Sequence, residues 1–280
     1  MEVGLIKLTC VVDNTVTHAS PMWGEHGLAF IIDTGQGKVL FDTGQSGTVL
    51  LHNLEVLREE PADISAIVLS HAHYDHTGGL ASFLNLRSSL PVVGHAELLT
   101  KRFVTRKKKP PRSVGVPLSK KELSKWADLR LSDDPVEVLP GLWTTGTIRQ
   151  RTEPEGRGSR HVIRKGEEYV PDPYLDDLSL VWKSQDGLVI ILGCAHAGLL
   201  NILAQVKETF SGPIQAVIGG THLADSGEAQ IAHVIQVLGE RYGDIKFYPN
   251  HCTGSEGFLA LAKAFGPAVK PCPAGTVVEF

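Results

Sequence analysis

The sequence predicts an α/β fold in which two sheets pack face to face and helices cover the outside. Two observations favour this class. Segments typical of strands and helices alternate over residues 6–93, and the same alternation returns after residue 175. Hydrophobic residues make up 42% of the chain and charged residues 21%, which is the composition of an ordinary globular protein. Because each half must bury one face of its sheet, we expect one domain spanning residues 1–280.

The first half begins with strands. Residues 6–12 and 28–32 are typical of β-strands, and residues 38–41 form a short apolar strand. The turn residues at 33–37 predict a hairpin between the last two strands. The remaining elements of this half are expected at 47–58 (a helix with apolar residues at helical spacing), 66–69 (a buried strand), 79–86 (a short helix) and 90–93 (a strand).

Residues 101–175 differ from the rest of the chain. Prolines, glycines and charges dominate there, a basic cluster occupies residues 106–112, and strand patterns survive only at 136–139 and 142–145. We therefore expect an irregular insertion, and insertions of this length in compact domains are usually functional or disordered. A lid over a site is the favoured interpretation, with a solvated excursion as the alternative. The basic cluster fits either a solvated face or contact with a phosphate on a small substrate.

The second half repeats the pattern of strands followed by helices. Two strands at 178–183 and 188–192 flank a hairpin turn at 185–187. The elements expected after them are a helix at 198–210, a strand at 216–218, a helix at 228–238, a strand at 245–248, a helix at 255–265 and a closing strand at 276–280.

The charge and the leading segment argue against several classes of protein. The formal net charge of −4 offers no overall attraction to nucleic acid or to an anionic membrane. No run approaches the roughly 20 apolar residues of a membrane span, and residues 1–12 alternate in polarity unlike a signal peptide. The four cysteines form no close pair, so we expect reduced thiols in a cytoplasmic protein, with a secreted disulfide protein as the alternative. The oligomeric state stays open.

Three histidines and one aspartate lie within one short segment. His71, His73, Asp75 and His76 directly follow the buried strand at 66–69. Buried without partners, these groups would repel one another and lose their hydration. A metal ion removes that cost, because neutral imidazole and carboxylate are its ligands. One metal would use only some of these groups, whereas two nearby metals would use them all. The alternative is a chance histidine-rich loop.

This pattern after a strand, His71-x-His73-x-Asp75-His76, resembles the defining motif of the metallo-β-lactamase superfamily. The resemblance implies an αββα sandwich with a di-metal site at one edge of the sheets. It implies that His71 and His73 bind one metal and that Asp75 and His76 bind the other. It also implies that Asp42, which ends an early strand, supports the ligands from behind. The alternative for Asp42 is a plain turn residue.

Two later histidines are expected to complete the ligand set. His196 and His251 each follow a predicted strand and precede a helix, where α/β folds place functional groups. We expect His196 to join His71 and His73, and His251 to join Asp75 and His76. The alternative for each is a histidine that merely starts a helix.

The chain departs from the superfamily's commonest pattern at one point. Many members place a bridging aspartate after the strand that corresponds to 188–192, where this chain has Cys194. Cys194 is open to three interpretations: a soft ligand, a nearby thiol, or a small buried apolar residue. Asp177, next to Asp176, lies upstream and offers a carboxylate instead. The metal count therefore stays open.

Two more histidines are expected at the rim of the site. His222 follows a glycine pair at a strand end, and His26 lies between glycines; both are expected to contact substrate, with structural hydrogen bonding as the alternative. The other histidines are expected at the surface or in packing: His18, His52, His95, His161 and His233.

Segments spread over nearly the whole chain narrow the resemblance to one branch. It is the branch named for 7,8-dihydropterin-6-methyl-4-(β-D-ribofuranosyl)aminobenzene-5′-phosphate synthase, an enzyme of methanopterin biosynthesis. The segments are Asp13-Asn14, Glu25-His26-Gly27, the histidine motif, Gly193-Cys194-Ala195-His196, Gly219-Gly220-Thr221-His222-Leu223 and His251-Cys252-Thr253-Gly254.

The resemblance implies a metal-dependent hydrolase or transferase that acts on a small molecule. For the synthase branch, this small molecule is a phosphorylated or pterin-type substrate. Two divalent metal ions are expected, Zn²⁺ first, with Mn²⁺ or iron as alternatives. Asp75 would orient or deprotonate a water, and His222 would meet developing charge. Hydrolysis of another ester, lactone or phosphodiester, and a metal-binding sensor without turnover, stay as alternatives. A nucleic-acid partner is disfavoured by the charge, and no membrane partner is expected.

Overall fold

The computed structural model describes residues 5–280, so the first four residues of the amino-terminal segment lie outside the described part. Most of the first half forms a sheet of seven strands in the order β17-β1-β2-β3-β4-β5-β8. Its strands are β1 (Lys7–Val12), β2 (Ala29–Asp33), β3 (Lys38–Phe41), β4 (Ile64–Val68), β5 (Leu90–Gly94), β8 (Ala127–Leu131) and β17 (Val277–Glu279). β1, β2 and β3 are antiparallel, whereas β3, β4, β5 and β8 run parallel.

The second sheet has six strands in the order β16-β15-β14-β13-β10-β9. Its strands are β9 (Glu137–Leu139), β10 (Leu142–Thr144), β13 (Leu180–Lys183), β14 (Leu188–Leu192), β15 (Ile214–Gly220) and β16 (Lys246–Asn250). β14, β15 and β16 are parallel, so their carboxyl ends meet at one edge of this sheet.

Alternation along the strands divides the core into layers. Phe30 and Ile32 of β2 point between the two sheets and pack with Trp182 and Ile191 of the second sheet. Ile31, between them in sequence, points to the outer face and packs under helices. The two sheets therefore share one apolar interior, and each has a second apolar face that helices must cover.

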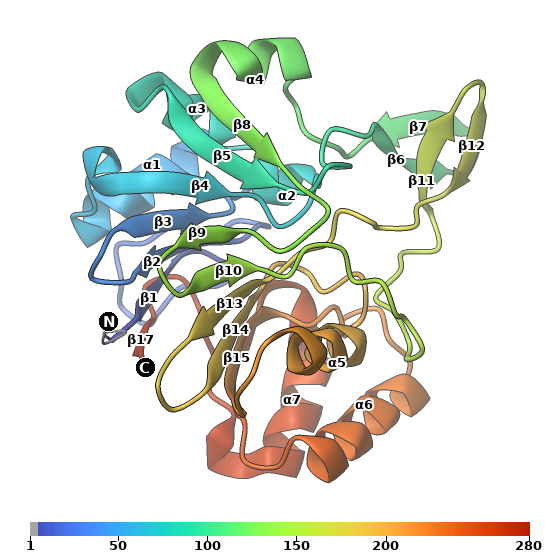
Figure 1. Ribbon diagram of the computed structural model, residues 1–280. Helices are drawn as coiled ribbons and strands as arrows, with labels where there is room; N and C mark the ends of the chain where they lie inside the picture. The colour runs from blue at the N-terminus through green and yellow to red at the C-terminus, as the bar shows by residue number, and fades with distance from the viewer. Residues whose placement is uncertain (1–4) are drawn as a thin grey trace.

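Helices cover both outer faces, as Figure 1 shows. The helices packed on the first sheet bury apolar residues against its outer face, and α5, α6 and α7 do the same on the second sheet. The helices are α1 (Gly47–Leu57), α2 (Tyr74–Thr77), α3 (Leu80–Leu86), α4 (Lys120–Trp126), α5 (Leu199–Thr209), α6 (Glu228–Arg241) and α7 (Gly254–Phe265), with 3-10 turns η1 (Pro61–Asp63), η2 (His251–Thr253) and η3 (Gly266–Ala268). Within residues 5–280, no helix is long and apolar enough to cross a membrane.

The predicted fold class is confirmed, and most predicted elements exist within a few residues of their expected bounds. β2 and β3 form the expected hairpin, with Asp33 paired to Lys38. α1 ends where expected because Arg58 adopts a left-handed conformation with φ of 57°, and its N–H donates to the carbonyls of Glu55 and Leu54.

Residues 101–175 are not an irregular insertion. They contribute α4 and β8 to the first layer, β9 and β10 to the second sheet, and a separate four-stranded sheet. We call this four-stranded sheet, in the order β12-β11-β6-β7, the small sheet; its strands are β6 (Arg102–Arg106), β7 (Lys109–Ser113), β11 (His161–Lys165) and β12 (Glu168–Pro171). Many of its residues are exposed, so its strands carry no apolar alternation to read. In Figure 1 it projects from the sandwich beside α2.

Candidate metal centre

Five polar side chains follow strands whose carboxyl ends meet at one edge of the sandwich. In the first sheet, Asp42 follows β3 and His71 follows β4. In the second sheet, His196, His222 and His251 follow β14, β15 and β16. Because these strands are parallel within each sheet, the loops that carry the five residues emerge on the same side.

Two glycines let the histidine motif fold tightly against the loop after β3. A Cβ on Gly78 would lie 2.0 Å from the carbonyl oxygen of Gln45, and one on Gly79 would lie 2.2 Å from that of Thr43. Only glycine fits such close backbone contacts. The short helix α2 therefore lies directly on this loop and turns Asp75 and His76 into the site.

The first cluster consists of His71, His73 and His196, whose ligand atoms all lie within 4.8 Å of one another. His73 Nδ1 and His196 Nε2 face each other at 3.2 Å. The second nitrogens of two rings are held elsewhere: the Ser70 hydroxyl lies 2.9 Å from His71 Nδ1, and the Gly156 carbonyl lies 3.0 Å from His196 Nδ1. His71 Nε2 is buried and has no hydrogen-bond partner within the described residues.

The second cluster consists of Asp75, His76 and His251. His76 Nε2 lies 3.2 Å from His251 Nε2, which in turn lies 3.5 Å from Asp75 Oδ2. The other nitrogens are again held: Asp42 Oδ2 lies 2.6 Å from His76 Nδ1, and Asn14 Oδ1 lies 2.9 Å from His251 Nδ1. The structure thus brings together each of the two sets of three residues that the sequence analysis groups. It also places the Asp42 carboxylate against the ring nitrogen of His76 that faces away from the cluster.

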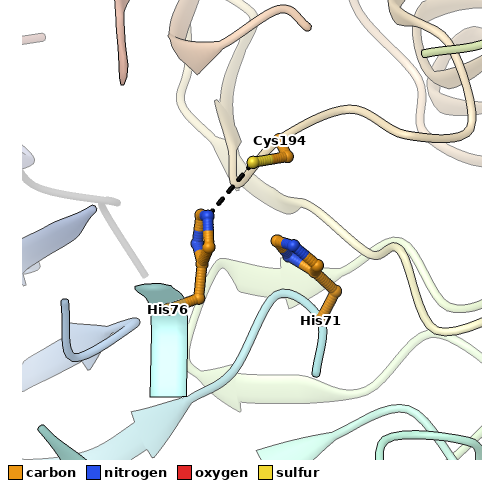
Figure 2. A group of neighbouring side chains, drawn as sticks. All are labelled: His71, His76 and Cys194. Carbon is orange, nitrogen blue, oxygen red and sulfur yellow. Dashed lines mark hydrogen bonds between the residues drawn. The ribbon is translucent and has the colours of Figure 1, made fainter. Parts of the chain in front are cut away.

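Cys194 lies between the two clusters. Its Sγ is 3.1 Å from His76 Nε2, and it lies within 4.8 Å of the ligand atoms of both His71 and His76. Figure 2 shows the two imidazole rings turned toward this buried sulfur. Asp177 instead accepts a hydrogen bond from the backbone N–H of Ala197 at 2.8 Å and belongs to none of the candidate ligand groups. It supports the loop that carries His196.

The electrostatics of the site depend on burial. Burial lowers the pKa of His71, His73 and His196 well below its usual value, so these imidazoles stay neutral. Burial alone would also lower the pKa of His76, but the Asp42 carboxylate raises it to about 9. Burial alone would raise the pKa of Asp75, yet the hydrogen bond with His251 and the charge of His76 lower it strongly.

These residues fit divalent metal ions. Each of four rings has one nitrogen held by a neighbouring group and the other turned inward, which is how proteins orient metal-binding histidines. The Ser70 hydroxyl donates to Asp42 and therefore accepts from the Nδ1–H of His71, which leaves on Nε2 a buried lone pair that a cation would satisfy. Neutral imidazole and carboxylate are ligands that Zn²⁺, Mn²⁺ and iron accept.

The two clusters open into a cavity of about 780 Å³. His222 lines it, with its ring centre 4.3 Å from that of His196. His26 also lines it and places Nε2 3.2 Å from Asp75 Oδ2. Both histidines therefore lie at the rim of the site, as the sequence predicts.

Sequence reasoning missed two residues that contact the first cluster. Tyr174 stacks on His196 with ring centres 4.2 Å apart, and its hydroxyl hydrogen-bonds to His161. His161, expected at the surface or in packing, lines the cavity with its ring centre 4.9 Å from that of His73. Both come from the segment predicted to be irregular, where no local pattern marked them.

Arginines form part of the wall of the cavity. Arg112, Arg157 and Arg160 all line it. Arg157 is neutralised by Glu155, whose carboxylate lies 2.7 Å from its Nε. Arg112 stands over the ring of Tyr74 at 5.3 Å, and neither it nor Arg160 forms an ion pair with any described residue. Only one residue of the predicted basic cluster, Arg112, therefore faces the site.

Four residues of the site adopt left-handed backbone conformations, although none is glycine. Their φ angles are 59° for Asp42, 57° for Ala195, 51° for His222 and 47° for His251. Such conformations cost of order 1 kcal/mol or more for non-glycine residues and cluster at functional sites.

A family model and a curated protein match the chain over most of its length. The model of the metallo-beta-lactamase superfamily matches residues 22–191. A curated relative from Methanocaldococcus jannaschii, 7,8-dihydropterin-6-methyl-4-(beta-D-ribofuranosyl)-aminobenzene-5'-phosphate synthase, is 28% identical over 293 aligned positions that cover 100% of this chain and 98% of the relative.

Two solved structures share the fold over almost their whole length. One is Tm1679, described as a metal-dependent hydrolase of the beta-lactamase superfamily. It is 26% identical, has a TM-score of 0.84, and aligns over 98% of this chain and 99% of its own. The other is the metallo-beta-lactamase fold protein YhfI from Bacillus subtilis, with 11% identity, a TM-score of 0.59 and 99% coverage of both chains. The second comparison bears on the fold alone.

Proposed function

Because the chain belongs to the metallo-β-lactamase superfamily, we propose that it is an enzyme that binds two divalent metal ions and acts on a small molecule. His71, His73 and His196 hold one ion, and Asp75, His76 and His251 hold the other. The observation that carries this proposal is the set of four inward-facing ring nitrogens whose partner nitrogens are each held by another group. Zn²⁺ suits these ligands best, with Mn²⁺ or iron as alternatives.

When bound, such ions lower the pKa of a water molecule and polarise a carbonyl or phosphoryl oxygen. The protein's own groups then act on the substrate. Asp75, ionised and 6% exposed at the floor of the cavity, orients a water or accepts its proton. His222, whose ring centre lies 4.3 Å from that of His196, stabilises charge that develops on the substrate. His26 holds the Asp75 carboxylate from the solvent side.

The substrate we propose is a phosphorylated small molecule, of the kind that the synthase from Methanocaldococcus jannaschii is named for. Arg112 and Arg160 supply positive charge on the cavity wall, and guanidinium groups bind phosphate through paired hydrogen bonds. The reaction we propose first is a transfer on a pterin-type substrate, by likeness to that synthase. We place the reaction in the cytoplasm, because the four cysteines are free thiols.

Hydrolysis of another ester, lactone or phosphodiester is the second candidate. It is favoured by the likeness to Tm1679, which is described as a metal-dependent hydrolase. Both candidates use the same metal ligands, so they differ in the groups that bind the substrate.

The test of the metal site compares His71→Ala and His76→Ala with His18→Ala, which replaces an exposed histidine. We expect elemental analysis to find two metal ions per chain in the control. The two site variants should lose metal, and they should lose activity against phosphorylated pterin, ester, lactone and phosphodiester substrates. Full activity in metal-depleted His71→Ala protein would refute the proposal.

The test of the arginine wall uses inorganic phosphate as the probe. Arg112→Gln and Arg160→Gln should each weaken phosphate binding about 10- to 100-fold, since a charged hydrogen bond contributes roughly 1.5–3 kcal/mol. Arg164→Gln is the matched control, because Arg164 is exposed and bonds only to the Gly166 carbonyl. Equal affinities of all three variants, measured by calorimetry, would remove the arginines from the substrate site.

A further inference from the structure

We propose that Cys194 bridges the two metal ions through its sulfur, so that one thiolate is a ligand shared by both clusters. This inference rests on the proposed function in requiring that the site hold two metal ions. It goes further because it assigns a seventh ligand and sets the preference of the site among metals.

The position of the sulfur supports a shared ligand. Cys194 Sγ belongs to one candidate ligand group with His71 and His76, and to a second with His251. His71 is part of the first cluster, whereas His76 and His251 are part of the second. The sulfur thus reaches nitrogens that our assignment gives to different metals, and Figure 2 marks its contact with the His76 ring by a dashed line.

A second observation points to a ligand at this place. His71 Nε2 is buried and has no hydrogen-bond partner within residues 5–280, and it faces the same space as the sulfur. Cys194 is itself only 3% exposed. A buried thiol and a buried unpartnered imidazole nitrogen are both satisfied by one cation between them.

The neighbouring thiol of Cys252 does not have the same geometry. Its Sγ lies 3.4 Å from the carbonyl oxygen of Cys194, to which a thiol there donates a hydrogen bond. It is also partly exposed, and among the described residues it shares a ligand group with His251 and Cys194 but with no member of the first cluster. Cys252 is therefore the matched control for Cys194.

A bridging thiolate has chemical consequences. On binding, the S–H bond of Cys194 breaks, its proton passes to solvent, and the sulfur lone pairs bind the two cations. Thiolate is a soft ligand that favours Zn²⁺ and disfavours Mn²⁺ and Mg²⁺. A thiolate from Cys194 therefore favours Zn²⁺ over Mn²⁺ at this site.

The first experiment replaces the native metal with Co²⁺, whose bond to a thiolate produces a charge-transfer band in the near ultraviolet. We expect the band in the wild-type protein and in Cys252→Ser. We expect its loss in Cys194→Ser and in Cys194→Asp, which offers a carboxylate in place of sulfur. A band that persists in Cys194→Ser, or that disappears in Cys252→Ser alone, overturns the proposal.

The second experiment needs no variant. X-ray absorption of the wild-type protein loaded with two Zn²⁺ ions should show a sulfur shell at about 2.3 Å. A shared sulfur gives about one sulfur neighbour per zinc, whereas a sulfur on one metal gives about half that number. Two bound ions with half a sulfur each, or with none, overturn the bridge and leave the proposed function intact. A protein that binds no metal overturns both.

Discussion

The four imidazole rings that face inward differ in what holds their second nitrogen. A hydroxyl holds His71, a backbone carbonyl holds His196, an amide oxygen holds His251 and a carboxylate holds His76. The carboxylate is the strongest of these acceptors, since it carries a full charge. His76 should therefore depend more on its supporting group than the other three rings do.

Asp42→Asn tests this dependence. The amide keeps an oxygen near the Ser70 N–H, which donates to Asp42 at 2.7 Å in the wild type, but it removes the charge beside His76. We expect metal affinity to fall about 10- to 100-fold, as is typical when a partner of a ligating histidine is lost. Competition with a chelator measures the affinity, and Asp63→Asn, which changes an exposed carboxylate, is the control.

The stability of the protein should depend on pH through the carboxyl group of Asp177. Burial raises the pKa of this carboxyl to about 7, whereas the unfolded chain titrates near 3.8. Between these values the folded state keeps a proton that the unfolded state has lost, so the contribution of Asp177 to stability falls as the pH rises. Asp177→Asn removes this loss. As the pH rises between these values, the free energy of unfolding of the variant should increase relative to that of the wild type. The expected increase is about 1.4 kcal/mol per pH unit, up to about 4 kcal/mol.

Urea unfolding of the metal-free proteins at pH 5 and pH 8 measures the difference. The amide oxygen that the substitution introduces can still accept the hydrogen bond from Ala197, so the loop that carries His196 is kept. A gap between variant and wild type that stays constant over this pH range would contradict the assignment.

At the level of single residues, the sequence predicts what is local and misses what depends on distant segments. The histidine motif is readable because its four candidate ligands lie within six positions after a strand. The place of Cys194 was left open because its contacts to His71 and His76 cross more than a hundred residues. Tyr174 and His161 were missed for the same reason, since His161 begins β11 of the small sheet and Tyr174 lies in the segment after β12.

Among the elements, the small sheet is joined to the sandwich by a buried ionic network. Arg102 at the start of β6 is 2% exposed; its Nε lies 3.0 Å from Asp172 and its Nη2 lies 2.7 Å from Asp176. Asp176 also accepts from the backbone N–H of Ala72 at 2.8 Å, inside the histidine motif. The network therefore connects the small sheet to the loop between His71 and His73.

Arg102→Gln should destabilise the protein by about 3–5 kcal/mol, because it leaves two buried carboxylates without their cation. Arg130→Gln is the control with the same change in charge. Its ion pair with Asp128 is more than half exposed, and such pairs contribute about 0–1 kcal/mol. Urea unfolding compares the two variants, and similar losses in both would show that the buried network contributes little.

The elements that bury an apolar face were predictable, and the small sheet was not. β2 and β14 are recognisable by apolar runs that fill the space between layers. β7 has the sequence Lys-Pro-Pro-Arg-Ser and is mostly exposed, so neither composition nor periodicity marks it as a strand. One local signal in this region does predict a helix start: Ser119 and Glu122 form a capping box at the beginning of α4.

At the scale of the whole molecule, the candidate metal centre draws its residues from both halves of the sandwich. His71, His73, Asp75 and His76 come from loops of the first sheet, whereas His196 and His251 come from loops of the second. Metal bound to both sets resists separation of the sheets. A ligand that binds only the folded state stabilises it by about 4 kcal/mol when its concentration is about 1,000 times its Kd.

Calorimetric scans should therefore show a midpoint of unfolding higher by about 10 °C in zinc than in chelator, at roughly 2–4 °C per kcal/mol. The shift should shrink in His71→Ala, in which one cluster is broken, and persist in His18→Ala. Midpoints that coincide with and without zinc would mean that the metal does not hold the sheets together.

Several residues around the site have strained, left-handed backbone conformations, which lower stability at positions that the proposed activity needs. His222 and His251 hold conformations that glycine adopts without cost, yet glycine carries no imidazole. Glycine at either position would remove this backbone strain, but it would also remove an imidazole of the site and, at His251, the stabilisation that bound metal would supply. Improving this catalyst by directed evolution therefore requires stabilising substitutions elsewhere, in the helices and at the edges of the sheets, while these few strained positions stay fixed.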